Sequence, residues 1–225
     1  GFTIHETFTG QVLATVAFTS RTQPAMSFSV GNRVYVGFRD RSSGPVRDVI
    51  QVYDLTADTQ SLQFVAELLM PTSTASFGYR FAFDDDRSSD AMTSVFACIG
   101  NEVVKIDGVA IPTLSSVGIG RSCSQRRLNV RNGFLVVADA ANTVYGLQAS
   151  NTPPTIQWTY ASTYLTGDPL IANYVWVGTA AGILVALDPA SGGEAGRTVV
   201  ASSAAYPVTA FGGNLFVVTR SSLIV

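Results

Sequence analysis

Carboxylates gather at one place in this sequence, the run Asp84–Asp86 with Asp90 a few residues later. Such a group resembles the ligand set of a calcium ion, which takes about 6–8 oxygens and needs a turn that points them inward. The residues Asp86–Ser89 lack the ligand spacing of a known calcium loop. We therefore expect a solvated loop here and no metal site.

His5 is the only histidine of the chain, so a histidine metal site or a catalytic triad would need partners that the sequence does not mark. It alternates with Ile4 and Phe2, and we expect it to face solvent or a strand neighbour. A glycosidase needs a pair of carboxylates at a fixed separation. Asp168 and Glu6 could lie near the axis of a ring, but nothing in the sequence fixes the distance between them.

The densest basic stretch contains four arginines, Arg121, Arg126, Arg127 and Arg131. Successive side chains of a strand point to opposite faces, so a strand over Gln125–Val130 would send Arg126 and Arg127 to different sides. A site for an anion or an acidic partner is one interpretation. A solvated edge is the interpretation that we favour.

Aromatic side chains suggest a third kind of site, because repeat proteins that bind sugars stack a pyranose on an exposed Trp or Tyr ring. The tyrosines available for this are Tyr160, Tyr164, Tyr174 and Tyr206. We expect Trp158 and Trp176 to pack between repeats. A lectin of this kind repeats its site in every unit, and Trp158 has no equivalent in the other units, which counts against that function.

The elements that must position these residues recur along the chain. The same short apolar strand occurs around Phe96, Val136, Trp176 and Phe216, at steps of 40, 40 and 40 residues. A fifth copy surrounds Tyr35, which lies 61 residues before Phe96. A fixed period of this size marks a repeat architecture, whose units bury their apolar faces only against one another.

Each unit contains the signals of four short strands. In the clearest copy these strands are Ile156–Tyr160, Leu170–Ala172, Tyr174–Gly178 and Ile183–Asp188, with turn-forming residues between them. Four antiparallel strands in about 40 residues fit one blade of a β-propeller, where radial repetition covers the faces and leaves few open edges. The sequence therefore predicts an all-β propeller of four-stranded antiparallel blades.

We predict five blades in a single domain over residues 1–225. Their approximate bounds are 12–55, 62–108, 109–150, 156–190, and 197–225 together with 1–9. In this arrangement the N-terminal strand completes the blade left open at the C-terminus, so that pairing of the two ends closes the ring. The alternative is a larger propeller that has lost residues or a second segment.

The first interval of the repeat is longer than the others, and two segments can hold the excess, Arg39–Asp48 and Phe83–Asp90. Loops accept insertions at little cost, and we expect both segments to be exposed, mobile and in contact with a partner. The candidate contact residues are Arg39, Arg41, Arg47, Asp84, Asp85, Asp86, Arg87 and Asp90.

Composition narrows the range of partners and compartments. Apolar residues make up 47% and charged residues 13% of the chain, as expected of a protein that buries most of its strands. The net charge of −2 gives no electrostatic basis for binding nucleic acid or an anionic membrane. No apolar run reaches the ~18 residues of a spanning helix, so we expect no direct membrane insertion.

The two cysteines, Cys98 and Cys123, form neither a disulfide framework nor a metal motif. Cys98 lies in an apolar strand, and we favour a buried free thiol there. A bridge between adjacent repeats is the alternative.

The segment Val175–Gly192 resembles the repeat of quinoprotein-like (PQQ-like) propellers, in which a strand of the type V-Y-V-G-T precedes a glycine turn and then L-Y-A-L-D. Asp54, Asp107 and Gln148 hold the place of Asp188 in the other units, and we expect the aspartates to form turns by bonding their own backbone. The resemblance implies the propeller fold and, by itself, no particular chemistry.

The enzymes of this superfamily bind pyrroloquinoline quinone with a calcium ion, usually in a larger ring. This sequence has nothing like the vicinal disulfide that covers the quinone in many of them, and no Glu-Asn-Asp set can be matched to calcium. Other members are non-catalytic scaffolds of bacterial outer-membrane assembly or of lumenal domains. The resemblance therefore implies no cofactor and an extracytoplasmic or lumenal location.

We accordingly predict a non-catalytic scaffold that mediates protein–protein interaction, a subunit of a larger assembly. Carbohydrate binding through exposed aromatic rings is the alternative. A glycosidase-type or quinone-dependent enzyme is third, because it would require paired carboxylates near the axis or a bound cofactor.

Overall fold

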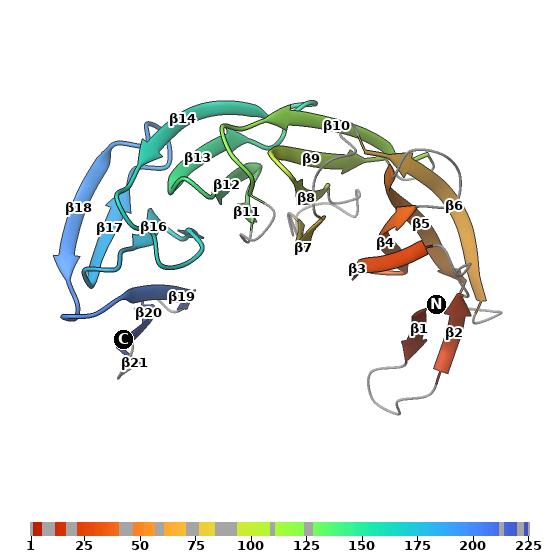
Figure 1. Cartoon of the computed structure of the whole chain (residues 1–225), viewed down its shortest axis with the longest axis horizontal. Coiled ribbons are helices and arrows are strands. Elements are labelled where there is room, and N and C mark those ends of the chain that lie inside the picture. Colours follow the sequence, from red (N-terminus) through yellow and green to blue (C-terminus); the bar gives the residue numbers. More distant parts are fainter. Residues whose placement is uncertain are drawn as a thin grey trace.

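A computed structural model of the chain describes residues 2–5, 12–16, 22–40, 47–56, 61–70, 77–83, 94–108, 111–123, 128–211, 214–219 and 223–224. All regular secondary structure in these residues is β-strand, and the sheets form an arc (Figure 1). No described helix is long and apolar enough to cross a membrane.

Four sheets contain four antiparallel strands each, paired in the order of the chain. The first sheet contains β3 (Thr22–Val30), β4 (Arg33–Asp40), β5 (Arg47–Thr56) and β6 (Ser61–Leu69). The second contains β7 (Phe77–Phe83), β8 (Val95–Ile99), β9 (Glu102–Asp107) and β10 (Thr113–Gly118). The third contains β11 (Asn129–Arg131), β12 (Phe134–Ala138), β13 (Thr143–Gln148) and β14 (Thr155–Ala161). The fourth contains β15 (Leu170–Ile171), β16 (Val175–Gly178), β17 (Ile183–Leu187) and β18 (Glu194–Val199).

A fifth sheet has three described strands, β19 (Ala205–Phe211), β20 (Asn214–Thr219) and β21 (Leu223–Ile224). The first strands of successive sheets lie side by side on the inner side of the arc, and the fourth strands form its outer rim (Figure 1). This is the architecture of a β-propeller with five blades, as the sequence predicts.

The apolar strand that repeats in the sequence is the second strand of each blade. The copies around Tyr35, Phe96, Val136, Trp176 and Phe216 fall in β4, β8, β12, β16 and β20. Every residue of β8 is buried. Such a strand is covered on both faces by neighbouring blades, which is why its sequence is a continuous apolar run rather than an alternating one.

The blades begin one strand later than the expected units. The unit 156–190 starts with the strand that the structure defines as β14, but β14 pairs with β13 and closes the preceding sheet. The segment Arg39–Asp48 also differs from the expected loop, because β4 continues to Asp40 and β5 begins at Arg47. Part of the extra length of the first repeat therefore lies in longer strands.

The N-terminal strand β1 (Phe2–His5) pairs with β2 (Val12–Val16) in a two-stranded sheet. In the C-terminal sheet, β21 pairs with β20. Among the described strands no pairing joins β1 to the C-terminal sheet, and the two ends of the arc face each other across its open side (Figure 1). The expected closure of the ring by the two termini is therefore not part of the described pairing.

The core consists of apolar layers between consecutive blades. One layer joins Tyr35 and Ile50 of the first blade to Val95 and Ala97 of the second. The alternate residues of the same strand, Phe96 and Cys98, point into the next layer, which includes Leu135, Val137 and Leu147 of the third blade. Each sheet therefore contributes to two layers, and no blade buries its faces without its neighbours.

The two cysteines form a disulfide, Cys98–Cys123, with the Cα atoms 5.8 Å apart. The expectation of a buried free thiol at Cys98 is therefore wrong, and the alternative of a bridge holds. Cys98 is the last residue but one of the apolar strand β8, whereas Cys123 lies in the connection from the second blade to the third. The bond therefore ties a blade to the link that leaves it.

Trp158 packs between the third and fourth blades, as expected. Its ring lies over Gly146 of β13 and against Gly192 of the turn after β17, and a Cβ atom at those positions would come within 2.2 and 2.5 Å of the indole. Gly192 also has a φ of +70°, which disfavours other residues. Trp176 is half-buried and packs against Leu184 and Ala205, between the fourth and fifth blades.

Substitution of Gly146 tests this packing. We expect Gly146→Ala to lower the free energy of unfolding by about 1–3 kcal/mol, because the new methyl group overlaps the Trp158 ring and forces a shift in a packed core. Urea denaturation followed by tryptophan fluorescence measures the change. Gly196→Ala is the matched control, since nothing lies within 4 Å of a Cβ atom there. Equal stability of the two variants would contradict the packing.

Candidate interaction surface

The blades present two sets of strand ends, which form two faces of the propeller. The face that carries the turns between second and third strands also carries the links between blades, and we name it the disulfide face because it contains Cys98–Cys123. The opposite face carries the turns after the first and third strands. We name it the clamp face, after three polar contacts between blades that lie there.

The first contact joins the first and second blades. Arg33, at the start of β4, binds Asp54 of its own blade through two nitrogens, at 2.7 and 2.8 Å. Its third nitrogen donates to the carbonyl of Gly108, which follows β9 of the second blade, at 3.1 Å. The carboxylate fixes the guanidinium plane, and the fixed guanidinium then holds the turn of the next blade.

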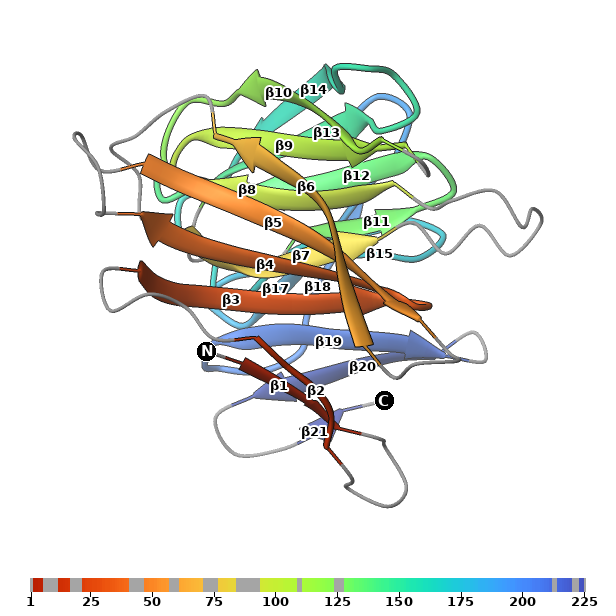
Figure 2. The ribbon, with the colours of Figure 1, turned by 90° about the vertical axis from the view of Figure 1, so that its right-hand side faces the viewer.

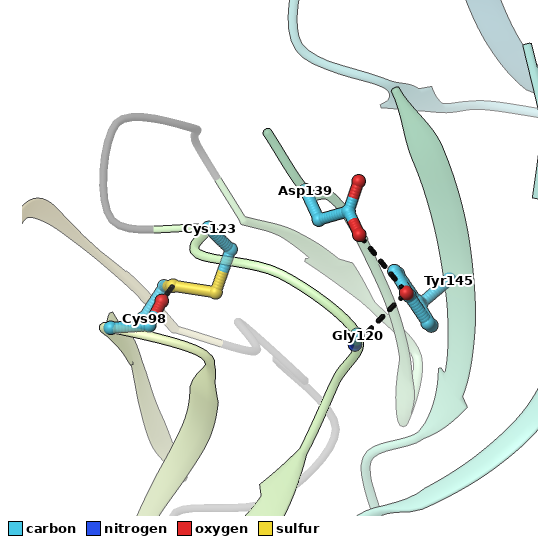
Figure 3. The surroundings of a disulfide bond; sticks show 6 residues. Cys98, Gly120, Cys123, Asp139 and Tyr145 are labelled. Atoms are coloured by element: carbon cyan, nitrogen blue, oxygen red, sulfur yellow. Dashed lines mark hydrogen bonds between the residues drawn. A yellow bond between two sulfur atoms is a disulfide. The ribbon is translucent and has the colours of Figure 1, made fainter. Parts of the chain in front are cut away.

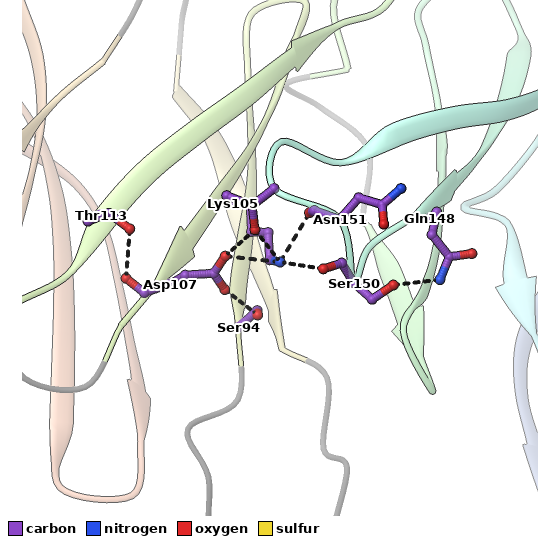
Figure 4. Close-up of polar contacts among 8 residues, drawn as sticks. Ser94, Lys105, Asp107, Thr113, Gln148, Ser150 and Asn151 are labelled. Carbon is purple, nitrogen blue, oxygen red and sulfur yellow. Dashed lines mark hydrogen bonds and ion pairs between the residues drawn. The ribbon is translucent and has the colours of Figure 1, made fainter.

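The second contact joins the second and third blades through Lys105, the single lysine of the chain (Figure 4). Its ammonium donates to the carbonyls of Ser150 and Asn151 at 3.3 and 3.1 Å, and to the Thr152 hydroxyl at 3.1 Å. Asp107 lies 2.9 Å away and neutralises the charge. The Lys105 side chain is only 4% exposed, so these oxygens replace its hydration shell.

The third contact joins the third and fourth blades. The indole nitrogen of Trp158 donates to the carbonyl of Pro189 at 2.7 Å. In each of the three contacts the donor reaches at least one carbonyl of the turn after the third strand of the following blade. Three different donors, a guanidinium, an ammonium and an indole, therefore perform the same structural task at successive junctions.

The recurring aspartates do not all perform the expected task. Asp188 does, since its carboxylate accepts from the backbone of Ala190 and Ser191 at 3.1 and 2.8 Å. The hydrogen bond from the Ser191 hydroxyl, together with these two from the backbone, lowers the pKa of Asp188. Asp54 and Asp107 instead hold the cations of the first two contacts.

The two segments expected to contact a partner flank opposite faces. β4 ends and β5 begins on the disulfide face, at Asp40 and Arg47. β7 ends at Phe83 and β8 begins at Val95, on the clamp face. Figure 2 shows the strands lengthwise, with the disulfide face at the left and the clamp face at the right. The two segments that the sequence predicts as contact sites therefore border two separate surfaces rather than one.

Arg39 is the candidate contact residue whose side chain is best defined. It binds Asp48 on the neighbouring strand through two nitrogens, at 2.9 and 3.3 Å, and the Asp48 side chain is fully buried. The guanidinium remains 28% exposed at the edge of the disulfide face. Arg39 thus secures the base of the β4–β5 connection and still presents part of its charge to solvent.

The other predicted residues are placed only in part. Arg47 begins β5 opposite Asp40. Of the remaining contact candidates, those outside the described residues are Arg41, Asp84, Asp85, Asp86, Arg87 and Asp90. The carboxylate cluster is therefore not tested. Of the basic stretch, Arg121 and Arg131 are exposed, and Arg126 and Arg127 lie outside the described residues.

The catalytic candidates are not brought together within the described residues. His5 pairs with Val12 in the N-terminal sheet, Asp168 lies in the link before β15, and Glu6 is outside the described residues. The described part of the chain also contains no group of three or more His, Cys, Asp or Glu residues that could hold a metal ion.

The aromatic candidates divide into buried and exposed rings. Trp158 is only 7% exposed, so it is not available to a sugar. Tyr164 and Tyr206 are 69% and 39% exposed, and both lie on the disulfide face near the link between the third and fourth blades. Tyr174 is also exposed, but it precedes β16 on the clamp face.

Known proteins share the fold of this chain but little of its sequence. No family model and no curated protein matches it. The structure superimposes on BamB from Moraxella catarrhalis with a TM-score of 0.55 and 15% identity. The match covers 92% of this chain and 63% of the BamB chain.

A second similar structure is the computationally designed Ika8 protein, with a TM-score of 0.50 and 15% identity over 94% of this chain and 71% of that one. The chain thus spans less than two thirds of the length of BamB. At these identities the likeness shows the β-propeller fold alone.

Removal of the Lys105 charge tests the second contact. We expect Lys105→Met to lower the free energy of unfolding by about 3 kcal/mol, because it leaves a carboxylate and two carbonyls without their buried donor. Chemical denaturation measures the loss. Arg197→Met is the control, because the Arg197–Glu194 pair is exposed on β18 and its removal should leave the midpoint unchanged. An equally small effect of Lys105→Met would refute the contact.

Tyrosine ionisation gives a second test. Burial raises the pKa values of Tyr35, Tyr53 and Tyr145, and the Asp139 carboxylate beside the Tyr145 hydroxyl adds to the effect there. The unfolded chain releases these protons near pH 10 while the folded chain retains them, so stability must fall as the pH rises beyond about 10. As the pH rises, phenolate absorbance should appear at a higher pH in the native protein than in the urea-unfolded one. Titration curves that coincide would contradict the burial of these tyrosines.

Proposed function

We propose that this chain is a non-catalytic scaffold that mediates protein–protein interaction as a subunit of a larger assembly, and that its repeats belong to the PQQ-like type. The observation that carries the proposal is the series of clamps on consecutive blades. Each of these contacts fixes the turn of the next blade with a buried donor, so the arc presents its two faces as rigid surfaces.

Rigidity favours binding because a surface that is already ordered loses little conformational entropy when a partner docks. The likeness to BamB supports the propeller fold that such a scaffold requires. The sequence supports a non-catalytic chain without a cofactor, because it has one histidine and no matched quinone or calcium ligands.

The partner is a protein rather than a nucleic acid, because the net charge of −2 provides no basic surface for phosphates. The contact segments are the ends of β4 and β5, with Arg39, Arg41 and Arg47, and the segment before β8, with Asp84–Asp86. The first set is basic and the second is acidic, and the described strand ends that border them lie on opposite faces. We therefore infer that a single compact partner uses one of them.

Glycan binding is the second candidate, and the exposure of Tyr164 and Tyr206 on one face favours it. Two tyrosine rings near the link to β15 could stack on a sugar. A glycan array with Tyr164→Ala as the control distinguishes this function. Glycan binding by the wild type that disappears in this variant would place the binding site at these rings.

Affinity capture from the native extract, with cross-linking and mass spectrometry, tests the scaffold. We expect a stoichiometric protein partner cross-linked near one of the two segments. Two variants locate the contact: the double variant Arg41→Ala with Arg47→Ala, and the triple variant Asp84→Asn, Asp85→Asn and Asp86→Asn. Loss of the charges that pair with the partner should weaken its binding by about tenfold or more. Only one of the two variants should do so.

Arg197→Ala on the outer rim is the control for this capture. It removes one charge, where the segment variants remove two or three, and it lies on β18, away from both segments. If both segment variants retained binding, neither segment would be the contact site. Recovery of the chain without any stoichiometric partner would contradict the scaffold itself.

A further inference from the structure

The disulfide lies at a crossing of three chain segments on the disulfide face (Figure 3). The Cys123 backbone donates to the Gly100 carbonyl of the β8–β9 turn at 2.8 Å. Its neighbour Ser122 accepts from Ala140, in the β12–β13 turn of the third blade, at 2.8 Å. The link from the second to the third blade is therefore held between turns of both, and the disulfide fixes it covalently.

Both cysteines are completely buried, each with 0% of its surface exposed. They belong to an apolar cluster that contains Phe96, Ile119 and Leu135. Apolar surroundings disfavour the thiolate, which is the form that exchanges with other thiols. A soluble reductant therefore cannot reach this bond in the folded protein, and the pair has the properties of a structural cross-link rather than of a redox-active site.

The backbone already sets the pair at bonding distance. Disulfides require Cα atoms about 4.4–6.8 Å apart, and the 5.8 Å separation lies inside this range. Cys98 and Cys123 are the only cysteines of the chain, so no other pairing within one molecule competes. The hydrogen bonds of the link hold Cys123 in place next to β8 through contacts that are independent of the sulfur atoms.

We propose that this protein folds in an oxidising compartment and that its native form contains the Cys98–Cys123 bond. The inference is independent of the scaffold function, because it rests on the burial of the pair. A chain that folded among reducing thiols would have to pack two thiols where the structure accommodates one bond. Stable disulfides persist in extracellular, periplasmic and lumenal spaces and are rare in reducing cytosol.

The chemistry balances with a thiol–disulfide oxidoreductase as the oxidant. Before the core closes, one cysteine loses its proton, and its thiolate attacks the disulfide of the oxidant to form a mixed disulfide and release one oxidant thiolate. The second cysteine, also deprotonated, attacks the protein sulfur of that mixed disulfide and displaces the other oxidant sulfur. The two cysteines are oxidised by two electrons, and the oxidant leaves as a dithiol after taking up the two protons.

Alkylation and mass spectrometry of the full chain from its natural host test the proposal. Denatured without reduction, the protein should incorporate no alkylating reagent, and after reduction it should incorporate two equivalents. A non-reducing digest should contain one linked peptide pair with Cys98 and Cys123. Two free thiols in the freshly denatured native protein would overturn the proposal.

A variant adds a measurement that depends on the bond itself. Closing a loop of 25 residues shifts the unfolding equilibrium by about 300-fold in the loop-entropy account. Reduction of the wild type under unfolding conditions should therefore lower its folding equilibrium constant by roughly that factor. The double variant Cys98→Ala with Cys123→Ala should show the same stability with and without reductant. Equal stability of the wild type with and without reductant would contradict the structural role of the bond.

Discussion

The structure depends on one constraint, which is that no blade can bury its own faces. A four-stranded sheet of this size exposes two apolar faces, and each layer of the core is built from residues of two consecutive blades. The strand β8 shows this most directly, because Val95 and Ala97 belong to one layer while Phe96 and Cys98 belong to the next. Stability is therefore a property of the junctions rather than of the sheets.

Polar contacts complete what apolar packing begins at these junctions. Arg33, Lys105 and Trp158 each reach the turn after the third strand of the following blade. Apolar layers are non-directional, whereas a hydrogen bond to one carbonyl fixes the position of one turn. The combination fixes how each blade is oriented on its neighbour.

Sequence alone predicts the second strands and the fold, because a buried strand with a fixed period leaves a strong apolar signal at Phe96, Val136 and Trp176. It does not predict where a blade begins. A period of 40 residues sets the spacing of the strands, but only hydrogen bonding shows that β14 belongs to β13. The clamps leave no repeat signal either, since their donors differ in type and occupy non-equivalent strands.

The disulfide and the candidate surface are two further features that the sequence alone does not predict. The separation of Cys98 and Cys123 becomes informative only when the link between blades is seen to return beside β8. Arg39 was predicted as a loop residue because Arg, Ser, Gly and Pro dominate the segment after it, yet its pairing with Asp48 extends the strands. Tertiary contacts override local composition in both cases.

Hydrogen exchange with rising denaturant reveals whether the blades form one rigid body through their junctions. We expect the amides of β8, β9, β12, β13, β16 and β17 to exchange together, in one slow group that opens only by global unfolding. Separate groups for the second, third and fourth blades, each with its own dependence on denaturant, would contradict it.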